Sequence, residues 1–209
     1  MRVCCLADLH GHVPPDVPAC DLLLLAGDLC PDGLAESERF LVDELAPWLA
    51  RQPAGEVAAV AGNHDRIAVE RPDVLRSLPG WRYLEHETEL LAGAVVAASP
   101  WSLEFGAWPL QAGEERLALL WGELPDDARI VLVHGPPYGH CDRTLRGDHG
   151  GSRSLLDRLL ELRGLELVCT GHIHEGHGRS RLPTGALVVN ASYVDVRFAP
   201  AHAPVLVEI

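Results

Sequence analysis

The sequence VAAVAGNHD spans residues 57–65 and joins an apolar run to a short polar turn. A continuous apolar run of this length is typical of a strand that is buried on both faces. In the turn, Asn63 offers a neutral amide oxygen that can bind a metal ion, and His64 offers an imidazole that exchanges a proton near neutral pH. Asp65 follows in a position to hold that imidazole. Gly, Asn and Asp are also common in ordinary turns between a strand and a helix, so the rest of the chain has to decide between the two interpretations.

Four further apolar runs end in residues of the same kind. Polar groups at the carboxyl ends of buried strands are where open α/β sheets place their ligand sites. A single His-x-His or Gly-Asp is more often a satisfied polar pair or a turn, but five such ends in one chain favour a site. The set exceeds the needs of one metal ion and suits two ions that share a carboxylate. The residues that follow the five runs are Asp8 and His10, Asp28, Asn63 and His64, His134, and His172 and His174.

The hydrophobic pattern predicts an α/β protein that forms one domain over residues 1–209. Pro47 is expected to kink or split the first helix, and Ser37 or Asp32 to cap it. Helices are expected at residues 37–51, 66–78 (broken, with Pro72 near a start), 114–121 and 154–162. Strands are expected at residues 2–7, 22–26, 57–61, 81–84, 130–133, 165–169, 179–182, 187–190 and 205–209, with a hairpin over 89–98 that bends at Gly93.

Composition narrows the possible partners. The formal net charge is −13, and all 17 basic side chains are arginine. Such a negative charge argues against a protein that grips nucleic acid polymers by their phosphates. The apolar runs are too short to cross a bilayer, and the first one is too short for a signal peptide, so no membrane association is expected. The six cysteines form no C-x-x-C pair and are interpreted as structural thiols of a cytoplasmic protein.

Taken together, the strand-end motifs resemble those of the calcineurin-like metallophosphoesterases. The matching motifs are Asp8-Leu9-His10, Gly27-Asp28, Gly62-Asn63-His64-Asp65, His134-Gly135 and Gly171-His172-Ile173-His174. This resemblance implies a sandwich of two mixed β-sheets with helices on the outer faces. It also implies that Asp28 bridges two metal ions, and that His64 is the catalytic acid, supported by Asp65. One ion would be held by Asp8, His10, Asp28 and His174, and the other by Asp28, Asn63, His134 and His172.

A narrower likeness points to the branch of metallophosphoesterase-domain-containing phosphodiesterases of the brain. After Gly27-Asp28 the chain reads Leu29-Cys30, where many family members have a further acidic or amide residue. The likeness rests on Ala98-Ser99-Pro100-Trp101, His134-Gly135-Pro136-Pro137, His149-Gly150-Gly151-Ser152, Gly171-His172-Ile173-His174-Glu175-Gly176 and Val189-Asn190-Ala191-Ser192.

These residues suit the hydrolysis of phosphate esters. Two divalent ions can bind the phosphoryl oxygens and lower the pKa of a water, which then attacks the phosphorus as hydroxide. His64 can donate a proton to the leaving oxygen. Mixed nitrogen and oxygen ligands suit Mn, Fe, Co, Ni or Zn better than Ca, without choosing among them.

The polar segment 138–152 is longer than most connections and is a candidate functional loop. Within it, Arg143, Arg146 and His149 are candidate contacts to the substrate, although exposed arginine is usually only solvated. Trp101 and Trp108 could stack on a nucleobase, although such residues more often pack within a loop or core.

The sequence therefore predicts a dinuclear-metal phosphohydrolase, most simply a phosphodiesterase on a small, nucleotide-like phosphate ester. A phosphomonoesterase on the same site is the alternative within enzymes. A scaffold without catalysis is the alternative from another class, but it would be expected to lack His64 or several ligands, which this chain has. The oligomeric state and the physiological substrate do not follow from the sequence.

Overall fold

The structure is a computed structural model that describes residues 1–209. The apolar run that leads into Gly62 forms an inner strand of a five-stranded sheet. The strand order is β13-β1-β2-β3-β4, and only β13 is antiparallel to its neighbour. Five consecutive residues of β2 are buried, which explains why its sequence is a run of leucines rather than an alternating pattern. The strands are β1 (Arg2–Leu6), β2 (Cys20–Ala26), β3 (Ala54–Val60), β4 (Arg82–Tyr83) and β13 (Val205–Glu208).

A second sheet of six strands faces the first, in the order β11-β12-β10-β9-β6-β5. Its inner strands run parallel, and the two edge strands are antiparallel to their neighbours. The strands are β5 (Glu87–Leu91), β6 (Ala94–Ser99), β9 (Ile130–Val133), β10 (Leu167–Thr170), β11 (Gly178–Arg181) and β12 (Leu187–Asn190). Two short strands, β7 (Ser102–Leu103) and β8 (Gln111–Ala112), form a separate pair above the second sheet.

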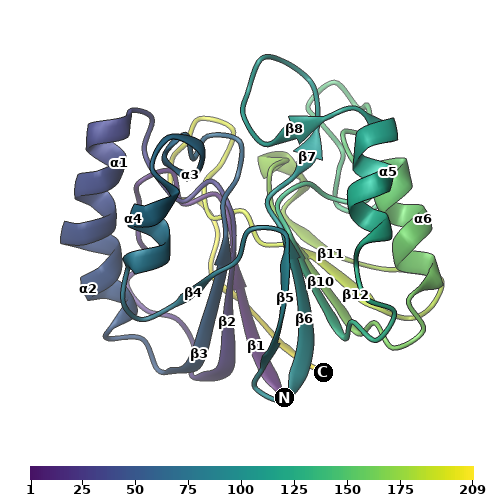
Figure 1. The fold of residues 1–209 in the computed structure, drawn as a ribbon, viewed down its shortest axis with the longest axis horizontal. Helices are drawn as coiled ribbons and strands as arrows, with labels where there is room; N and C mark the ends of the chain where they lie inside the picture. Colours follow the sequence, from purple (N-terminus) through teal and green to yellow (C-terminus); the bar gives the residue numbers. More distant parts are fainter.

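Helices cover the outer face of each sheet, which confirms the predicted sandwich (Figure 1). Three layers of apolar side chains result: one under each set of helices, and one of 21 buried residues between the sheets. The helices are α1 (Leu34–Phe40), α2 (Ala46–Leu49), α3 (Ile67–Glu70) and α4 (Pro72–Ser77) on the first sheet, and α5 (Glu114–Gly122) and α6 (Arg153–Glu161) on the second. A 3-10 turn, η2, spans His174–Gly176. No helix combines the length and the apolar character that a membrane span requires.

The first helical segment differs in detail from the prediction. It begins at Leu34, and its cap position is Gly33, with no side-chain cap from Ser37 or Asp32. The Ser37 hydroxyl instead donates to the carbonyls of Pro31 and Gly33 from inside the helix. A π-helical turn, η1 (Leu41–Leu45), precedes Pro47. Because proline lacks an N–H and crowds the carbonyl four residues earlier, this wider turn lets the helix pass Pro47 without ending.

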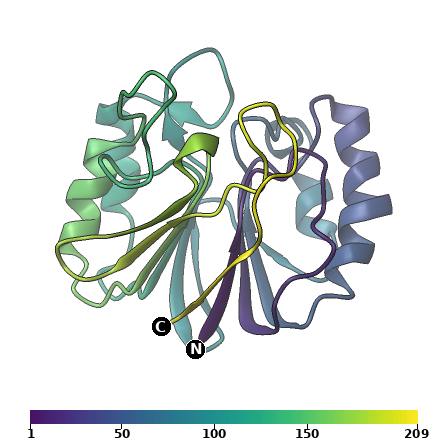
Figure 2. The ribbon, with the colours of Figure 1, turned by 180° about the vertical axis from the view of Figure 1, so that it is seen from behind.

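The carboxyl ends of the parallel strands meet at one edge of the sandwich, opposite the two chain termini (Figure 2). The sheets are also joined at this edge. The backbone N–H of Ala7 donates to Ala191, and that of Tyr193 donates to Ala7, so the end of β1 pairs with the segment after β12. The strand ends of both sheets are thereby fixed relative to each other, which allows residues from both to form one site.

Candidate metal centre

The strand-end residues converge in two groups that could each hold a metal ion. Within each group the ligand atoms all lie within 4.8 Å of one another. Both groups combine residues from the two sheets: the first three motifs of the chain come from β1, β2 and β3, and the last two from β9 and β10. The groups are Asp8, His10 and His174, and Asp28, His134 and His172.

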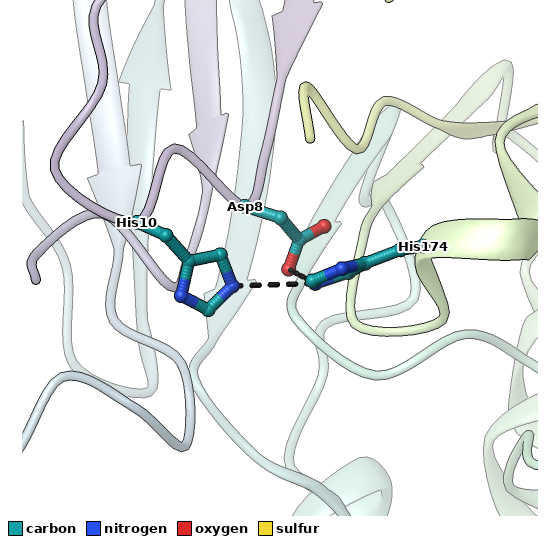
Figure 3. A group of neighbouring side chains, drawn as sticks. All are labelled: Asp8, His10 and His174. Carbon is teal, nitrogen blue, oxygen red and sulfur yellow. Dashed lines mark hydrogen bonds and ion pairs between the residues drawn. The ribbon is translucent and has the colours of Figure 1, made fainter. Parts of the chain in front are cut away.

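In the first group two imidazoles point toward each other with a carboxylate beside them (Figure 3). The Nε2 atoms of His10 and His174 are 3.2 Å apart, and Nε2 of His174 is 3.6 Å from Oδ1 of Asp8. The Nδ1–H of His174 donates to the carbonyl of Asp195 at 3.0 Å, so its Nε2 is the atom presented to the site. Two lone pairs that face each other at this distance repel, unless a proton or a cation lies between them. The donor set therefore fits a bound cation.

In the second group, nitrogen and oxygen atoms also converge on one point. Nε2 of His134 lies 3.3 Å from Oδ2 of Asp28, 3.1 Å from Oδ1 of Asn63 and 3.2 Å from Nδ1 of His172. The Nδ1–H of His134 donates to the carbonyl of Ala26 at 2.8 Å, which again leaves Nε2 for the site. Oδ2 of Asp28 is also 3.8 Å from Nε2 of His10 in the first group. Asp28 is thus the carboxylate that faces both groups.

The backbone is strained where these residues occur. Asp8, His10, Asp28 and His172 all have positive φ, between 44° and 70°. The left-handed region is unfavourable for residues with a Cβ, by about 1–3 kcal/mol each, and such residues persist where the surrounding structure holds them. Their concentration at one edge is expected if the geometry of the site, rather than local stability, determines the backbone.

Two glycines allow the strand ends to approach each other. A Cβ at Gly62 would collide with the carboxylate of Asp28, and one at Gly171 would collide with that of Asp8. These positions therefore have no room for any side chain, which accounts for a glycine before Asn63 and another before His172.

Burial and charge set the protonation of the site. Burial lowers the pKa of His10 to about 4 and that of His172 to about 3, so both imidazoles are neutral at pH 7 and have lone pairs to offer. Burial also opposes the ionisation of Asp28, but the neighbouring His134 outweighs it and holds the pKa of Asp28 well below its usual value. For His134, burial opposes the protonated form, but Asp28 outweighs it and raises the pKa to about 9. A positive charge is therefore stabilised between these two residues.

A network from β12 supports both histidines of the Gly171-His172-Ile173-His174 motif. The Asn190 amide donates to the carbonyls of Gly171 and Ile173, at 3.1 and 2.8 Å. The Ser192 hydroxyl lies 2.7 Å from Oδ1 of Asn190 and 2.6 Å from Oδ2 of Asp8. Outer contacts of this kind orient metal ligands and fix their protonation.

His64 lies beside the two groups, but its partner differs from the one expected. Its Nδ1 is 3.0 Å from Oδ1 of Asp32, which leaves Nε2 free. The prediction that Asp65 supports this imidazole is wrong. The carboxylate of Asp65 is buried and accepts hydrogen bonds from the backbone N–H groups of residues 29, 30 and 62. Burial and the nearby charge of Asp28 raise its pKa to about 6. Asp65 therefore ties the end of β3 to the end of β2.

A pocket of about 330 Å³ opens above these groups. Its floor includes Asp28, Asn63, His64, His172 and His174, and Glu175 is the other charged residue in its lining. Its rim is apolar, and five of its six apolar residues belong to the ten large apolar side chains that the whole molecule exposes. The apolar residues are Phe105, Trp108, Leu145, Ile173, Val196 and Phe198. Such a concentration of exposed apolar surface marks a place for a ligand.

The structure distinguishes among the weaker candidates for contact with the substrate. Trp108 lies at the pocket, with its ring centroid 4.2 Å from that of His64, whereas Trp101 packs against the core under α5 and α6. In the loop 138–152, Arg146 and His149 line a hollow that adjoins the pocket. Arg143 instead donates to the carbonyl of Gly147 within the loop, so it braces the loop.

Four residues that contribute to the site had no predicted role in it: Asp32, Asp142, Asn190 and Ser192. A signal existed for two of them, because Asn190 ends the apolar strand β12 and Ser192 follows it, much as the other site residues follow their strands. For Asp32 and Asp142 no spacing rule applies, since their contacts depend on the path of the loops.

Comparisons with known proteins agree with this geometry. A family model described as calcineurin-like phosphoesterase matches residues 1–176. Metallophosphoesterase domain-containing protein 1 of Homo sapiens is 26% identical over an alignment that covers all of this chain and 71% of that protein. A protein named probable rhamnogalacturonate lyase C, from Emericella nidulans, is 32% identical over 86% of this chain. This match spans only 18% of that protein, so its name says little about the matched part.

Among solved structures, a dimetal phosphatase from Danio rerio has the same fold, with a TM-score of 0.55 at 13% identity. The superposition covers 98% of this chain and 91% of the other.

Proposed function

Because this chain belongs to the calcineurin-like phosphoesterase family, we propose that it hydrolyses phosphodiester bonds in a small substrate with the help of two divalent cations. The observation that carries the choice of a diester is the lining of the pocket above the candidate metal groups. None of the twelve residues in that lining is an arginine, and the chain contains no lysine. Two of the twelve are carboxylic acids, Asp28 and Glu175.

This lining favours a substrate with a single negative charge. A phosphomonoester carries between one and two negative charges at neutral pH, and sites for such groups commonly use arginine, which binds phosphate oxygens in a bidentate way. A phosphodiester carries one negative charge and two organic groups. The apolar rim suits the organic groups, and the lining holds no arginine or lysine for a second charge.

The donor set fits two metal ions. Asp8, His10, Asp28 and His174 would hold one ion, and Asp28, Asn63, His134 and His172 the other, with Asp28 shared. Mixed nitrogen and oxygen donors suit Mn, Fe, Co, Ni or Zn. Bound there, the ions would neutralise charge on the phosphoryl oxygens and make a water acidic enough to act as a nucleophile.

The chain's own residues contribute the proton for the leaving group. The Nδ1–H of His64 donates to Asp32, which leaves Nε2 without a partner in the protein, and His64 lines the pocket. When Nε2 carries a proton, it can pass that proton to the leaving alkoxide as the P–O bond breaks, which is the role of a general acid. The carboxylate of Asp32 holds the imidazole in this orientation and is therefore proposed as a positioning residue.

The test compares two substrates with the same leaving group. Protein loaded with each candidate metal should hydrolyse bis(4-nitrophenyl) phosphate with a higher kcat/KM than 4-nitrophenyl phosphate. Faster turnover of the monoester would make the protein a phosphomonoesterase on the same site. No turnover of either ester with any of the five metals would favour a scaffold.

The state of the cysteines is relevant to the cellular compartment of the protein. All six are free thiols, and five of them are buried. Because disulfides are rare in reducing compartments, this supports a proposal that the protein acts in the cytoplasm.

A further inference from the structure

A second hollow adjoins the pocket above the candidate metal groups. It has a volume of about 560 Å³ and shares Phe105, His172 and Ile173 with that pocket. It lies between the loop after β7 and the loop 138–152, and His64 is not part of its lining. A diester whose phosphorus lies over the metal groups has two organic groups to place. The leaving group has to be near His64, so the retained group extends to the other side, where this hollow opens.

The lining of the hollow combines an aromatic face with hydrogen-bonding groups of both kinds. The side chain of Phe105 is exposed, and its ring centroid is 5.4 Å from that of His172. Arg146 is a donor, and Glu104 and Asp148 are acceptors in the same lining. The hydroxyl of Thr144 is buried and has no hydrogen-bond partner in the protein. Because two carboxylates accompany the one arginine, the hollow is not a site for a further anion.

His149 is held in place before any ligand binds. Its Nδ1 lies 2.7 Å from Oδ1 of Asp142, which is buried. The other oxygen of Asp142 accepts hydrogen bonds from the backbone N–H groups of Gly139 and Gly151, at 2.9 and 3.1 Å. The ring of Tyr138 packs against the imidazole, with the centroids 4.7 Å apart. Since Nδ1–H donates to Asp142, Nε2 remains free to bond a ligand. The side chain is already fixed, so little conformational entropy is lost when a ligand binds.

An exposed ring beside fixed donors and acceptors is the combination that recognises a flat, polar ring. Stacking on an aromatic side chain contributes affinity, and hydrogen bonds to the ring edge contribute selectivity. We propose that this hollow is a specificity subsite for a heteroaromatic group, such as a nucleobase, on the retained side of a phosphodiester. Phe105 stacks on the ring, and Arg146 and His149 bond to its edge. This inference rests on the proposed phosphodiesterase function.

The experiment keeps the broken bond constant and changes only the retained group. Thymidine 5′-(4-nitrophenyl) phosphate and methyl 4-nitrophenyl phosphate both release nitrophenolate. The metal-loaded wild-type protein should cleave the thymidine ester with a kcat/KM about ten-fold higher or more, mainly through a lower KM. The variants Arg146→Ala and His149→Ala, which lie outside the pocket above the metal groups, should each reduce this ratio several-fold, with turnover of the methyl ester unchanged within about three-fold. Phe105→Ala should also reduce the ratio several-fold, because kcat/KM for the thymidine ester should fall more than that for the methyl ester.

Arg163→Ala is the matched control, because it removes an exposed arginine that lies beyond the end of α6, away from the hollow. Its ratio of kcat/KM for the thymidine ester to that for the methyl ester should equal the ratio of the wild type. A second measurement does not depend on turnover. In the zinc-loaded protein, the imidazole resonances of His149 in the NMR spectrum should shift on addition of thymidine 5′-phosphate but not of methyl phosphate.

The outcomes distinguish the two proposals. If both esters are cleaved at equal kcat/KM by the wild type, the subsite is wrong while the phosphodiesterase function stands. If the wild type prefers the thymidine ester but all three variants keep that preference, the ring binds elsewhere and the subsite is again wrong. If neither ester is cleaved, the proposed function fails and the subsite fails with it.

Discussion

Asp28 is the residue on which the proposed dinuclear centre depends most. Its carboxylate is buried and faces a histidine from each group, His134 at 3.3 Å and His10 at 3.8 Å. The side-chain oxygen of Asn63, in contrast, lies 3.1 Å from Nε2 of His134, in the second group. A shared ligand and a ligand of one ion should therefore respond differently to removal.

Asp28→Ala should lose more than one equivalent of metal per chain, whereas Asn63→Ala should lose about one. Asp32→Ala is a control, because it removes a carboxylate outside both groups and should retain two equivalents. Elemental analysis of the purified proteins measures this directly. Two full equivalents in Asp28→Ala would show that Asp28 does not bridge.

The contact between His64 and Asp32 leads to a prediction about leaving groups. An alkoxide is basic and needs a proton as it leaves, whereas nitrophenolate is stable as an anion. Replacing His64 by Gln should therefore reduce kcat for an alkyl or nucleoside leaving group by about 10²–10⁴-fold, and much less for the aryl group. Asp32→Asn should act in the same direction with a smaller loss. Steady-state kinetics on paired diesters would show it, and equal losses on both leaving groups would mean that His64 stabilises charge without donating a proton.

At this scale the sequence predicted which residues meet but not how they are oriented. The convergence of Asp8, Asp28 and Asn63 follows from a general rule, because the carboxyl ends of parallel strands in one sheet share an edge. The rule does not bring His134 and His172 of the second sheet to the same place, and their part in the site was implied by the resemblance. The partner of His64 did not follow. Asp65 is adjacent in sequence, but the turn directs its carboxylate back to the backbone after β2, and the loop from residue 29 to 33 brings Asp32 to the imidazole instead. Adjacency in sequence says little about side-chain direction in a turn.

At the scale of elements, Glu114 links the first turns of α5 and α6. Its carboxylate accepts hydrogen bonds from the backbone N–H groups of Arg153 and Ser154 and from the hydroxyls of Ser152 and Ser154. Ser152 also caps α6 by accepting from the N–H of Leu155. Glu114 thus completes the start of a helix that leads directly from the loop 138–152.

This linkage predicts a pH dependence of stability. Burial opposes the ionised form of Glu114, but the hydrogen bonds from Ser154 and its neighbours outweigh it and lower the pKa below the ordinary value of 4.5. A lowered pKa in the folded state adds stability above the ordinary value and loses it as the pH falls through the folded value. Glu114→Gln should therefore lower the free energy of unfolding at pH 7, by at most about 1–2 kcal/mol, because solvent screens part of the interaction. The difference from wild type should shrink below about pH 4.5.

Urea unfolding at several pH values measures that difference. The exposed neighbour Glu115 supplies the matched control, since Glu115→Gln removes the same charge from the same helix turn without these contacts. A cost that stays constant from pH 7 to pH 3 would mean that the hydrogen bonds, and not the ionised state, determine the effect.

Element types were predictable from periodicity, and their ends were less so. The strand from Ile130 to Val133 was predicted to the residue, because an apolar run bounded by polar residues on both sides leaves little choice. The helix before β3 was placed three residues late, since Gly33 rather than Ser37 or Asp32 precedes its first turn. A glycine cap carries a weaker sequence signal than a side-chain cap.

At the scale of the whole molecule, the proposed metal site spans the junction of the two sheets. Asp8, Asp28 and Asn63 follow strands of the first sheet, whereas His134 and His172 follow strands of the second. Four of the site residues also have strained backbone. Ions bound at this junction would tie the sheets together and offset that strain, so metal binding should contribute to the stability of the entire fold.

The position of the proposed metal ions between the two sheets leads to a prediction about thermal stability. A ligand that binds only the folded state adds about 2.7 kcal/mol at a free concentration 100 times its dissociation constant. For a protein of about this size, this corresponds to a rise in Tm of about 5–10 °C. Calorimetric scans of metal-loaded wild type, with and without a chelator, should show such a difference, and strands of both sheets should lose hydrogen-exchange protection together on chelation. In Asp28→Ala the chelator should have little effect. An unchanged Tm in the wild type, or a loss of protection confined to one sheet, would show that the ions do not join the two halves of the sandwich.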